Sequence, residues 1–418
     1  MENYGRPATE DDVCALPDYF APGSDRNSYL GLSTRLLDFL SAFDQIVEYA
    51  LTESVDLVVF SGDAYKTREP SQTHQREFAR RISSLAKHGI PVFLLVGNHD
   101  IPHALGRANA LEIFPTLSVQ SVTVAETLTT HVINTRAGSI QIVALPWPRW
   151  RNLLSSEEHR GKSFEELTTY VEAELTRRLL LEFDALDPAI PALLSGHVTI
   201  AGATTSSERS MTLGRDHVLQ YSSLATPTLD YVALGHIHKH QVLGDLPPIV
   251  YPGSVQTIDF GEQDDIKGFC VVDIDPSKPS GHRATWEFIP VNNRRFHTID
   301  VRIPKSEEDP TRLVLRSIDK VNIDGSIVRV RIQALGELMS RLDMRQIRQS
   351  LTTAHLTAGI KKEVIQTHRT RLGRTARGIA PDQALRWYLE QHDSIDSKVK
   401  LQVLNRGLEL ISEEGIQS

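Results

Sequence analysis

The sequence predicts an α/β protein. The apolar runs Val55 to Phe60 and Val92 to Val96 are too short for helices and lack helical periodicity, so they predict buried strands. The first run is followed by Ser61, Gly62 and Asp63, and the second by Gly97 and three polar side chains. Residues 32–51 carry apolar side chains at helical spacing, and residues 71–87 also predict a helix. Strands that alternate with helices predict a parallel sheet, whose carboxyl edge collects ligands and metals.

Further elements of the first 290 residues follow the same signals. Residues 1–30 contain prolines, glycines and acids without a period and predict an irregular loop. A short helix is expected over 104–114 and a long one over 165–183. The apolar runs predict strands at 118–124, 130–133, 139–144, 192–194 and 231–234.

The pattern changes near Asn292. Strands are predicted at 296–303, 327–332 and 360–366, with helices at 311–320 and 341–355. Residues 373–378 predict a linker, and residues 381–391 and 394–413 predict two helices. The last helix has an apolar face that either packs on its own domain or docks on a partner. We therefore divide the chain into domains at 1–290, 291–375 and 376–418.

Composition indicates a soluble globular protein. The chain has 418 residues, 40% hydrophobic and 23% charged, and no apolar run is long enough to span a bilayer. Its first residues are acidic and predict no signal peptide, so a cytoplasmic location is expected. Cys14 and Cys270 are too few for a disulfide framework or a cysteine zinc site.

Charge is unevenly distributed along the chain. The net charge is −8, yet residues 291–375 hold 17 Lys and Arg against 9 Asp and Glu. This basic module is a candidate polyanion-binding surface. Ordinary solvated surface is the alternative interpretation of such a charge run.

Five metal-capable side chains follow the predicted strands: Asp63, Asn98, His197, His236 and His238. A carboxylate can bridge two divalent ions, imidazoles bind transition metals, and an amide oxygen is a neutral ligand. Two ions about 3.5–4 Å apart can hold a phosphate and activate a water. Taken singly, each residue has another explanation, such as a helix cap for the aspartate or a buried core histidine.

The two residues after Asn98 complete this group. His99 is a candidate catalytic acid or a hydrogen-bond donor to a phosphate, and we expect Asp100 to orient its ring.

These motifs resemble the calcineurin-like metallophosphoesterase superfamily, and within it the SbcD-type DNA repair exonucleases. The resemblance rests on five stretches, Ser61–Tyr65, Gly97–Pro102, Ala144–Arg149, Tyr231–Gln241 and Tyr251–Glu262. It implies a four-layer α/β/β/α sandwich, a smaller α/β capping domain that contacts DNA, and a helical segment that docks on a coiled-coil ABC ATPase of the SbcC type. It also implies a homodimer, associated with the nucleoid, with two Mn²⁺ ions; Mg²⁺ is the alternative metal.

The resemblance also assigns roles. Asp63 would bridge both metals, Asn98, His197 and His236 would complete one of them, and His238 would bind the other. Phosphate contacts would come from the basic module, with four candidate residues: Arg294, Arg295, Arg329 and Arg331. Dimer contacts would come from the predicted helices at 71–87 and 104–114.

One family motif has no match in the chain. The superfamily begins with D-x-H on a first strand, whereas the first histidine here is His74. Either an internal methionine has been taken as the start, or the chain is a short form. We therefore expect the chain as written to be poorly stable or poorly active.

Three functions compete at this point. The resemblance implies a metal-dependent nuclease with exonuclease activity on duplex ends and endonuclease activity on single strands. A phosphoesterase acting on small phosphodiesters and a non-catalytic scaffold of the same repair complex are the alternatives.

Overall fold

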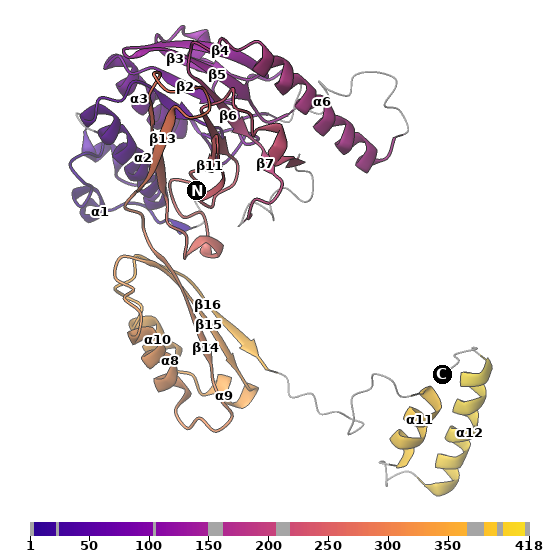
Figure 1. The fold of residues 1–418 in the computed structure, drawn as a ribbon. Helices are drawn as coiled ribbons and strands as arrows, with labels where there is room; N and C mark the ends of the chain where they lie inside the picture. Colours follow the sequence, from indigo (N-terminus) through magenta and orange to yellow (C-terminus); the bar gives the residue numbers. More distant parts are fainter. Residues whose placement is uncertain are drawn as a thin grey trace.

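The computed structural model describes residues 4–21, 25–102, 106–148, 162–205, 218–365, 380–390 and 396–413. Figure 1 shows a larger body with strands β1 to β13, a smaller body with β14 to β16, and a helical pair, α11 and α12. The predicted linker at 373–378 lies outside the described residues.

The first sheet of the larger body is parallel, in the order β1-β2-β3. Its strands are β1 (Val58–Phe60), β2 (Val92–Leu95) and β3 (Val122–Ala125). Helices α2 (Thr34–Thr52) and α3 (Gln72–Lys87) cover one face. Apolar side chains from both helices and the sheet share one buried cluster, which includes Val47, Phe78, Ile82 and Leu94.

The second sheet has the order β10-β11-β9-β6-β5-β4. These strands are β4 (Thr129–Thr135), β5 (Gly138–Leu145), β6 (Ala192–His197), β9 (Tyr231–Gly235), β10 (Gln241–Asp245) and β11 (Pro248–Tyr251). The four inner strands are parallel, and the outer strands β4 and β10 are antiparallel to their neighbours.

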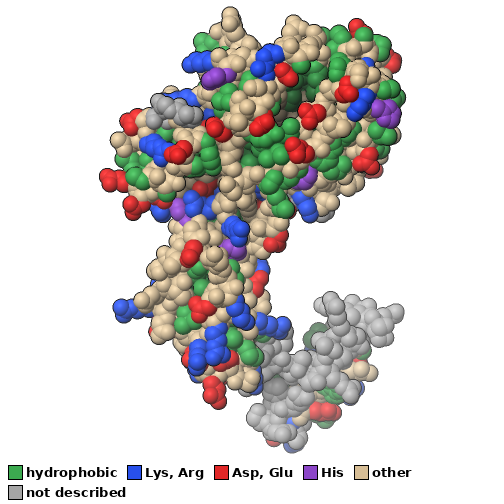
Figure 2. Space-filling view, turned by 60° about the vertical axis from the view of Figure 1, so that its left-hand side comes forward, with side chains coloured by type: hydrophobic (Ala, Val, Ile, Leu, Met, Phe, Trp, Pro, Cys, Tyr) green, Lys and Arg blue, Asp and Glu red, His purple; other side chains and the backbone are tan. Residues whose placement is uncertain are grey.

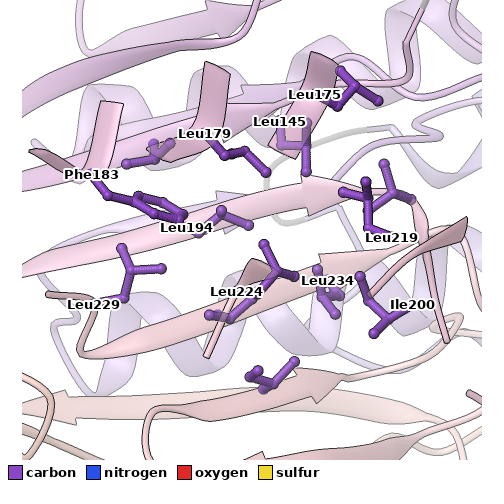
Figure 3. Packing of buried hydrophobic residues seen from close by; sticks show 14 of the residues in the cluster. Leu145, Leu175, Leu179, Phe183, Leu194, Ile200, Leu219, Leu224, Leu229 and Leu234 are labelled. Carbon is purple, nitrogen blue, oxygen red and sulfur yellow. The ribbon is translucent and has the colours of Figure 1, made fainter. Parts of the chain in front are cut away.

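Helix α6 (Phe164–Asp184) covers the outer face of the second sheet. Figure 3 shows Leu175, Leu179 and Phe183 of this helix packed against Leu145 and Leu194 of the strands. The inner faces of the two sheets meet in a separate cluster, where Phe93 and Leu95 pack with residues such as Ile142 and Leu193. The layers thus run helix, sheet, sheet, helix, which confirms the predicted α/β sandwich.

A two-stranded hairpin, β12 (Gly268–Ile274) and β13 (Ala284–Pro290), completes the larger body. The remaining short elements are α1 (Glu10–Cys14), η2 (Arg26–Tyr29), α4 (Ile113–Thr116), β7 (Thr199–Ile200), β8 (Val218–Leu219), η4 (Tyr221–Ser223) and η5 (Phe260–Glu262).

The smaller body has its own apolar core. Its parallel sheet has the order β14-β15-β16. The elements are β14 (Phe296–Arg302), α8 (Pro310–Asp319), β15 (Ile327–Ala334), α9 (Gly336–Ser340), α10 (Met344–Gln349) and β16 (Leu356–Val364). Helices α11 (Pro381–Glu390) and α12 (Ser397–Glu413) follow. The domain boundaries at residues 290 and 375 stay a prediction.

Polar contacts join the smaller body to helix α2. Arg294 forms an ion pair with Asp38 at 2.7 Å, and the His355 ring lies 2.9 Å from the Thr34 hydroxyl. These contacts place the amino end of α2 against the smaller body.

Three local predictions were wrong. Residues 1–30 include helix α1, which starts with a Thr9–Asp12 capping box. The prediction of a helix over 104–114 was wrong for its described part, which is irregular as far as the start of α4. The Asn109 side chain accepts a hydrogen bond from the Leu111 N–H and thereby competes with helix formation. The predicted helix at 341–355 is reduced to α10, which Asp343 caps at its start.

No helix in the described ranges is long and apolar enough to cross a bilayer.

Candidate metal centre

The candidate site lies where strands of both sheets end. Asp63 and Asn98 follow β1 and β2 of the first sheet, whereas His197 ends β6 and His236 follows β9 of the second. Because β6 and β9 are adjacent and parallel, their carboxyl ends lie side by side. The structure thus brings together four of the five predicted ligands.

Ligand atoms of these residues converge. One atom each from Asp63, His197 and His236 lies within 4.8 Å of the others, a spacing that could hold a metal ion. The Asn98 side-chain oxygen is 3.0 Å from His197 Nε2 and 3.1 Å from His236 Nδ1. Asp63 Oδ2 lies 3.2 Å from the same His197 nitrogen.

The donor set fits a divalent cation. The His197 Nδ1–H donates to the Ser61 carbonyl at 2.7 Å, so in the neutral ring Nε2 carries a lone pair. That lone pair faces the oxygens of both Asp63 and Asn98. Three acceptors directed at one point repel one another unless a cation or a proton lies between them. The ligand types, imidazole, carboxylate and amide oxygen, suit a transition metal.

Electrostatics in the site also favour a cation. Burial disfavours the charge of Asp63, but the nearby His197 ring outweighs it and holds the pKa of Asp63 well below its usual range. Burial likewise disfavours a charged His197 ring, but Asp63 raises the pKa of His197 above its ordinary value. The cluster therefore favours positive charge between its oxygens.

Backbone strain marks the same residues. Asp63 and His236 have φ angles of 57° and 84°. These angles lie in the left-handed region, which residues other than glycine rarely adopt. Such outliers persist where the surroundings enforce them, and they cluster at functional sites. The neighbouring Gly62 and Gly235 leave room for the cluster, because a Cβ at either position would collide with the His197 ring.

His99 lies beside the cluster. Its backbone N–H donates to Asp63 Oδ1 at 2.8 Å, and burial lowers the pKa of its ring. The ring is therefore neutral at pH 7. His99 lines the same cavity as Asp63 and His236.

Asp100 does not orient the His99 ring as expected. It is fully buried, and its Oδ2 accepts hydrogen bonds from the backbone N–H groups of Asp63 and Gly97, each at 2.9 Å. Its other oxygen is buried without a hydrogen-bond partner among the described residues. Asp100 therefore fastens the loop after β1 to the loop after β2.

His238, the fifth predicted ligand, lies outside the four-residue cluster but lines the same cavity. Its Nδ1–H donates to Glu262 at 2.8 Å, which places Nε2 on the side of the ring away from Glu262. Glu262 also accepts from Lys267 at 2.9 Å, and both of these side chains are fully buried. Lys267 donates in turn to the His238 carbonyl at 2.9 Å, so the pair holds both ring and backbone of His238.

Three residues of this site were missed by sequence reasoning. Trp147 packs its ring 4.9 Å from that of His236, and Glu262 and Lys267 orient His238. Trp147 and Glu262 lie in the stretches Ala144–Arg149 and Tyr251–Glu262, which carry the family resemblance. The resemblance pointed to these stretches but did not predict the contacts of Trp147 with His236 or of Glu262 with His238.

The four predicted DNA-binding arginines differ in their surroundings. Arg294 is paired with Asp38, and Arg329 stacks 4.3 Å above the Phe260 ring and donates to Thr298. Arg331 forms an ion pair with Asp300 at an exposed position, and Arg295 is exposed. Arg294 and Arg329 therefore have structural contacts that the prediction did not anticipate.

Comparison with known protein families shows which family this part of the chain resembles. Residues 35–240 match the family model of the calcineurin-like phosphoesterases. This range contains all five predicted ligands, helix α3 and all of helix α2 except Thr34. Over these residues, about half of its length, the chain is similar to the calcineurin-like phosphoesterases. Members of this family bind divalent metals, in agreement with the convergence at Asp63.

Individual proteins that resemble this chain give a more specific comparison than the family model. The chain is 26% identical to the SbcD subunit of the nuclease SbcCD of Bacillus subtilis over 260 residues, covering 61% of this chain and 64% of that protein. It is 26% identical to the same subunit of Escherichia coli over 228 residues, covering 52% and 55%. The DNA double-strand break repair protein Mre11 of Thermoplasma acidophilum is 37% identical over 81 residues, covering 19% and 22%. The chain thus matches less than two thirds of each relative.

The raised pKa of Asp100 predicts that the stability of the fold depends on pH. Burial first, and then the Asp63 charge, raise the pKa of Asp100 to about 7 from an ordinary 3.8. The pKa of Asp100 is higher in the folded chain than in the unfolded chain. The contribution of Asp100 to folding stability is therefore complete below pH 3.8 and is lost as pH rises through about 7. Asp100→Asn keeps an oxygen for the two N–H donors and stays neutral.

In urea unfolding with a chelator present, we expect the stability of Asp100→Asn relative to wild type to increase from pH 5 to pH 8, by on the order of a few kcal/mol. Asp300→Asn, at an exposed ion pair, serves as control. Parallel pH profiles for wild type and Asp100→Asn would contradict this role.

The buried Glu262–Lys267 pair gives a second prediction, for the stability of the fold and the tautomer of His238. Removing its charge leaves Lys267 buried beside the weaker partner Asp265, at 3.4 Å. Breaking a buried ion pair costs about 3–5 kcal/mol. We expect Glu262→Gln to lose stability on this scale and the His238 ring to lose its fixed Nδ1–H tautomer, as measured by ¹⁵N NMR. Asp265→Asn is the matched control, and equal effects of the two substitutions would refute the assignment.

Proposed function

We propose that this chain is the nuclease subunit of an SbcD-type DNA repair complex, a metal-dependent phosphodiesterase that cuts duplex ends and single-stranded DNA. The observation that carries the proposal is the convergence of Asp63, Asn98, His197 and His236 at the joined ends of two sheets. Similarity to named SbcD subunits and to Mre11 supports DNA as the substrate.

The proposed centre holds two Mn²⁺ ions. Asp63, Asn98, His197 and His236 would bind one, and Asp63 with His238 would contribute to the other. When bound, such ions hold the phosphate and lower the pKa of a coordinated water. The Ser61 carbonyl fixes His197 and Glu262 fixes His238, so both rings are oriented before metal binds.

His99 would act on the substrate directly. A neutral ring can donate a hydrogen bond to a phosphate oxygen or to the leaving oxygen as the diester bond breaks. Its backbone bond to Asp63 fixes its position relative to the centre.

The smaller body would bind the DNA backbone, and the helical pair would bind the ATPase. Figure 2 shows lysines and arginines on the smaller body, interspersed with acidic residues. On α12, Val399, Leu401, Val403 and Leu410 are exposed hydrophobic residues. They are suited to packing against a coiled coil. Dimerisation through α3 and the 104–114 region stays part of the proposal.

His99→Ala tests the catalytic assignment. We expect Mn²⁺-dependent cleavage of a labelled duplex to fall by about 10²–10⁴-fold relative to the unsubstituted chain. Mn²⁺ affinity, measured by electron paramagnetic resonance, should change little, whereas His236→Ala should weaken it. His88→Ala, an exposed histidine at the end of α3, is the control.

Two outcomes would contradict the proposal. Mn²⁺-dependent hydrolysis of a small diester without DNA cleavage would support a small-molecule enzyme. Metal binding without any hydrolysis, unaffected by His99→Ala, would support the scaffold.

Salt dependence tests the DNA-binding surface. We expect Arg295→Ala and Arg331→Ala each to weaken duplex binding across sequences and to reduce the slope of log K against log salt by about 0.9 for each phosphate that is no longer neutralised. Fluorescence anisotropy at several salt concentrations measures both. Arg177→Ala, an exposed arginine of α6, is the control. An unchanged slope would exclude these two residues from phosphate contact.

A further inference from the structure

The short helix η5 joins the smaller body to the candidate metal centre. Its last residue, Glu262, is fully buried and holds the His238 ring. Its first residue, Phe260, contacts side chains of the smaller body. Only one residue separates Phe260 from Glu262, so a displacement of Phe260 moves Glu262 as well.

Two side chains of the smaller body cover the Phe260 ring. The Phe296 ring of β14 packs against it in a T-shaped arrangement, with ring centroids 5.0 Å apart. The Arg329 guanidinium of β15 lies over it, 4.3 Å from the ring centroid. A guanidinium above an aromatic face is attracted to the ring, and its apolar stem covers apolar surface. Phe260 is therefore held from the side of the smaller body.

Thr298 of β14 links Arg329 to the other end of η5. Its hydroxyl accepts a hydrogen bond from Arg329 Nε at 2.9 Å, and its backbone N–H donates to Gln263 Oε1 at 3.0 Å. Gln263 directly follows Glu262 in the chain. Arg329 thus acts on both ends of η5, on one directly and on the other through Thr298.

Glu262 passes the position of η5 on to His238. One of its oxygens accepts a hydrogen bond from His238 Nδ1–H at 2.8 Å. The other accepts from the Ile258 N–H and from Lys267, each at 2.9 Å. Because both oxygens are engaged, the carboxylate cannot turn to absorb a shift of η5 without breaking one of these bonds. A shift of the helix therefore changes the contact with His238.

We propose that Arg329 is a positioning residue of the metal centre, which holds η5 in place and thereby orients the His238 ring. It acts through Phe260 and Glu262 rather than by contact with metal or substrate. The inference rests on the proposed role of His238 as a metal ligand. It gives Arg329, one of the four arginines expected to contact DNA, a different task.

Arg331 provides a matched control for this role. It lies two residues further along β15, so its side chain is on the same face of the strand as that of Arg329. Its guanidinium pairs with Asp300 at an exposed position instead of covering Phe260. Comparison of the two arginines separates the contact with Phe260 from a general loss of positive charge on the smaller body.

Histidine-ring ¹⁵N NMR of the metal-free chain, at one fixed pH, tests the proposal. The His238 signal is identified by its loss in His238→Gln. In Arg329→Ala we expect the single Nδ1–H tautomer of His238 to give way to a mixture of both tautomers. Amide hydrogen exchange at Gly261 and Glu262 should become about ten-fold faster. Arg331→Ala should leave both readouts as they are in the unsubstituted chain.

A second pair of variants separates this role from damage to the fold. Arg329→Gln and Arg329→Lys both keep an apolar stem over Phe260, but only the lysine keeps a cation for the ring. We expect Arg329→Gln to shift the His238 signal in the direction seen for Arg329→Ala, and Arg329→Lys to shift it less. Amide exchange in β6 and β9 should be unchanged in both variants.

Two results would overturn the proposal. The first is a His238 signal in Arg329→Ala or Arg329→Gln that matches the unsubstituted chain, because Arg329 would then not orient the ring. The second is an equal change in Arg331→Ala, because the cause would then be the charge of the smaller body as a whole. These readouts need neither metal nor DNA. A chain that binds no Mn²⁺ or cuts no DNA would therefore contradict the proposed function and leave this comparison intact.

Discussion

The hydrogen bond from the His197 ring to the Ser61 carbonyl fastens the two sheets together where their strands end. Ser61 belongs to the loop after β1 and His197 to the end of β6, so this bond crosses the central interface of the sandwich. It also fixes the ring tautomer and points Nε2 at Asp63 and Asn98. The fold and the candidate metal centre therefore depend on the same contact.

Close approach of the two sheets imposes further requirements on the chain. Glycines at 62 and 235 leave space for the His197 ring, and Asp63 and His236 accept left-handed backbone angles. Asp100 ties the loops after β1 and β2 together, and the Glu262–Lys267 pair holds His238 from the opposite side. Burial of these polar groups costs desolvation. The Glu262–Lys267 pair offsets this cost through charge-assisted hydrogen bonds, whereas burial raises the pKa of Asp100 to about 7. Orientation of the ligands is thus built in before any ion binds.

Much of this arrangement could be predicted from sequence, because short apolar runs that end in glycine and a ligand are a local signal. The positions of β1, β2, β6 and β9 followed from that signal. The hairpin β12–β13 was missed although β12 contains the apolar run Phe269–Val272, because neither strand ends in a glycine followed by a metal-capable side chain. Glu262 was missed for a different reason: its partner His238 lies 24 residues away, and only the fold brings them to 2.8 Å. The role of Asp100 was wrong because a carboxylate beside a histidine in sequence can bind backbone N–H groups instead.

Anomalous X-ray scattering at the manganese edge, from crystals grown with Mn²⁺, tests the account most directly. The account predicts a peak between the ligand atoms of Asp63, Asn98, His197 and His236. A crystal in which Mn²⁺ binds elsewhere, while these four side chains keep their mutual hydrogen bonds, would contradict it.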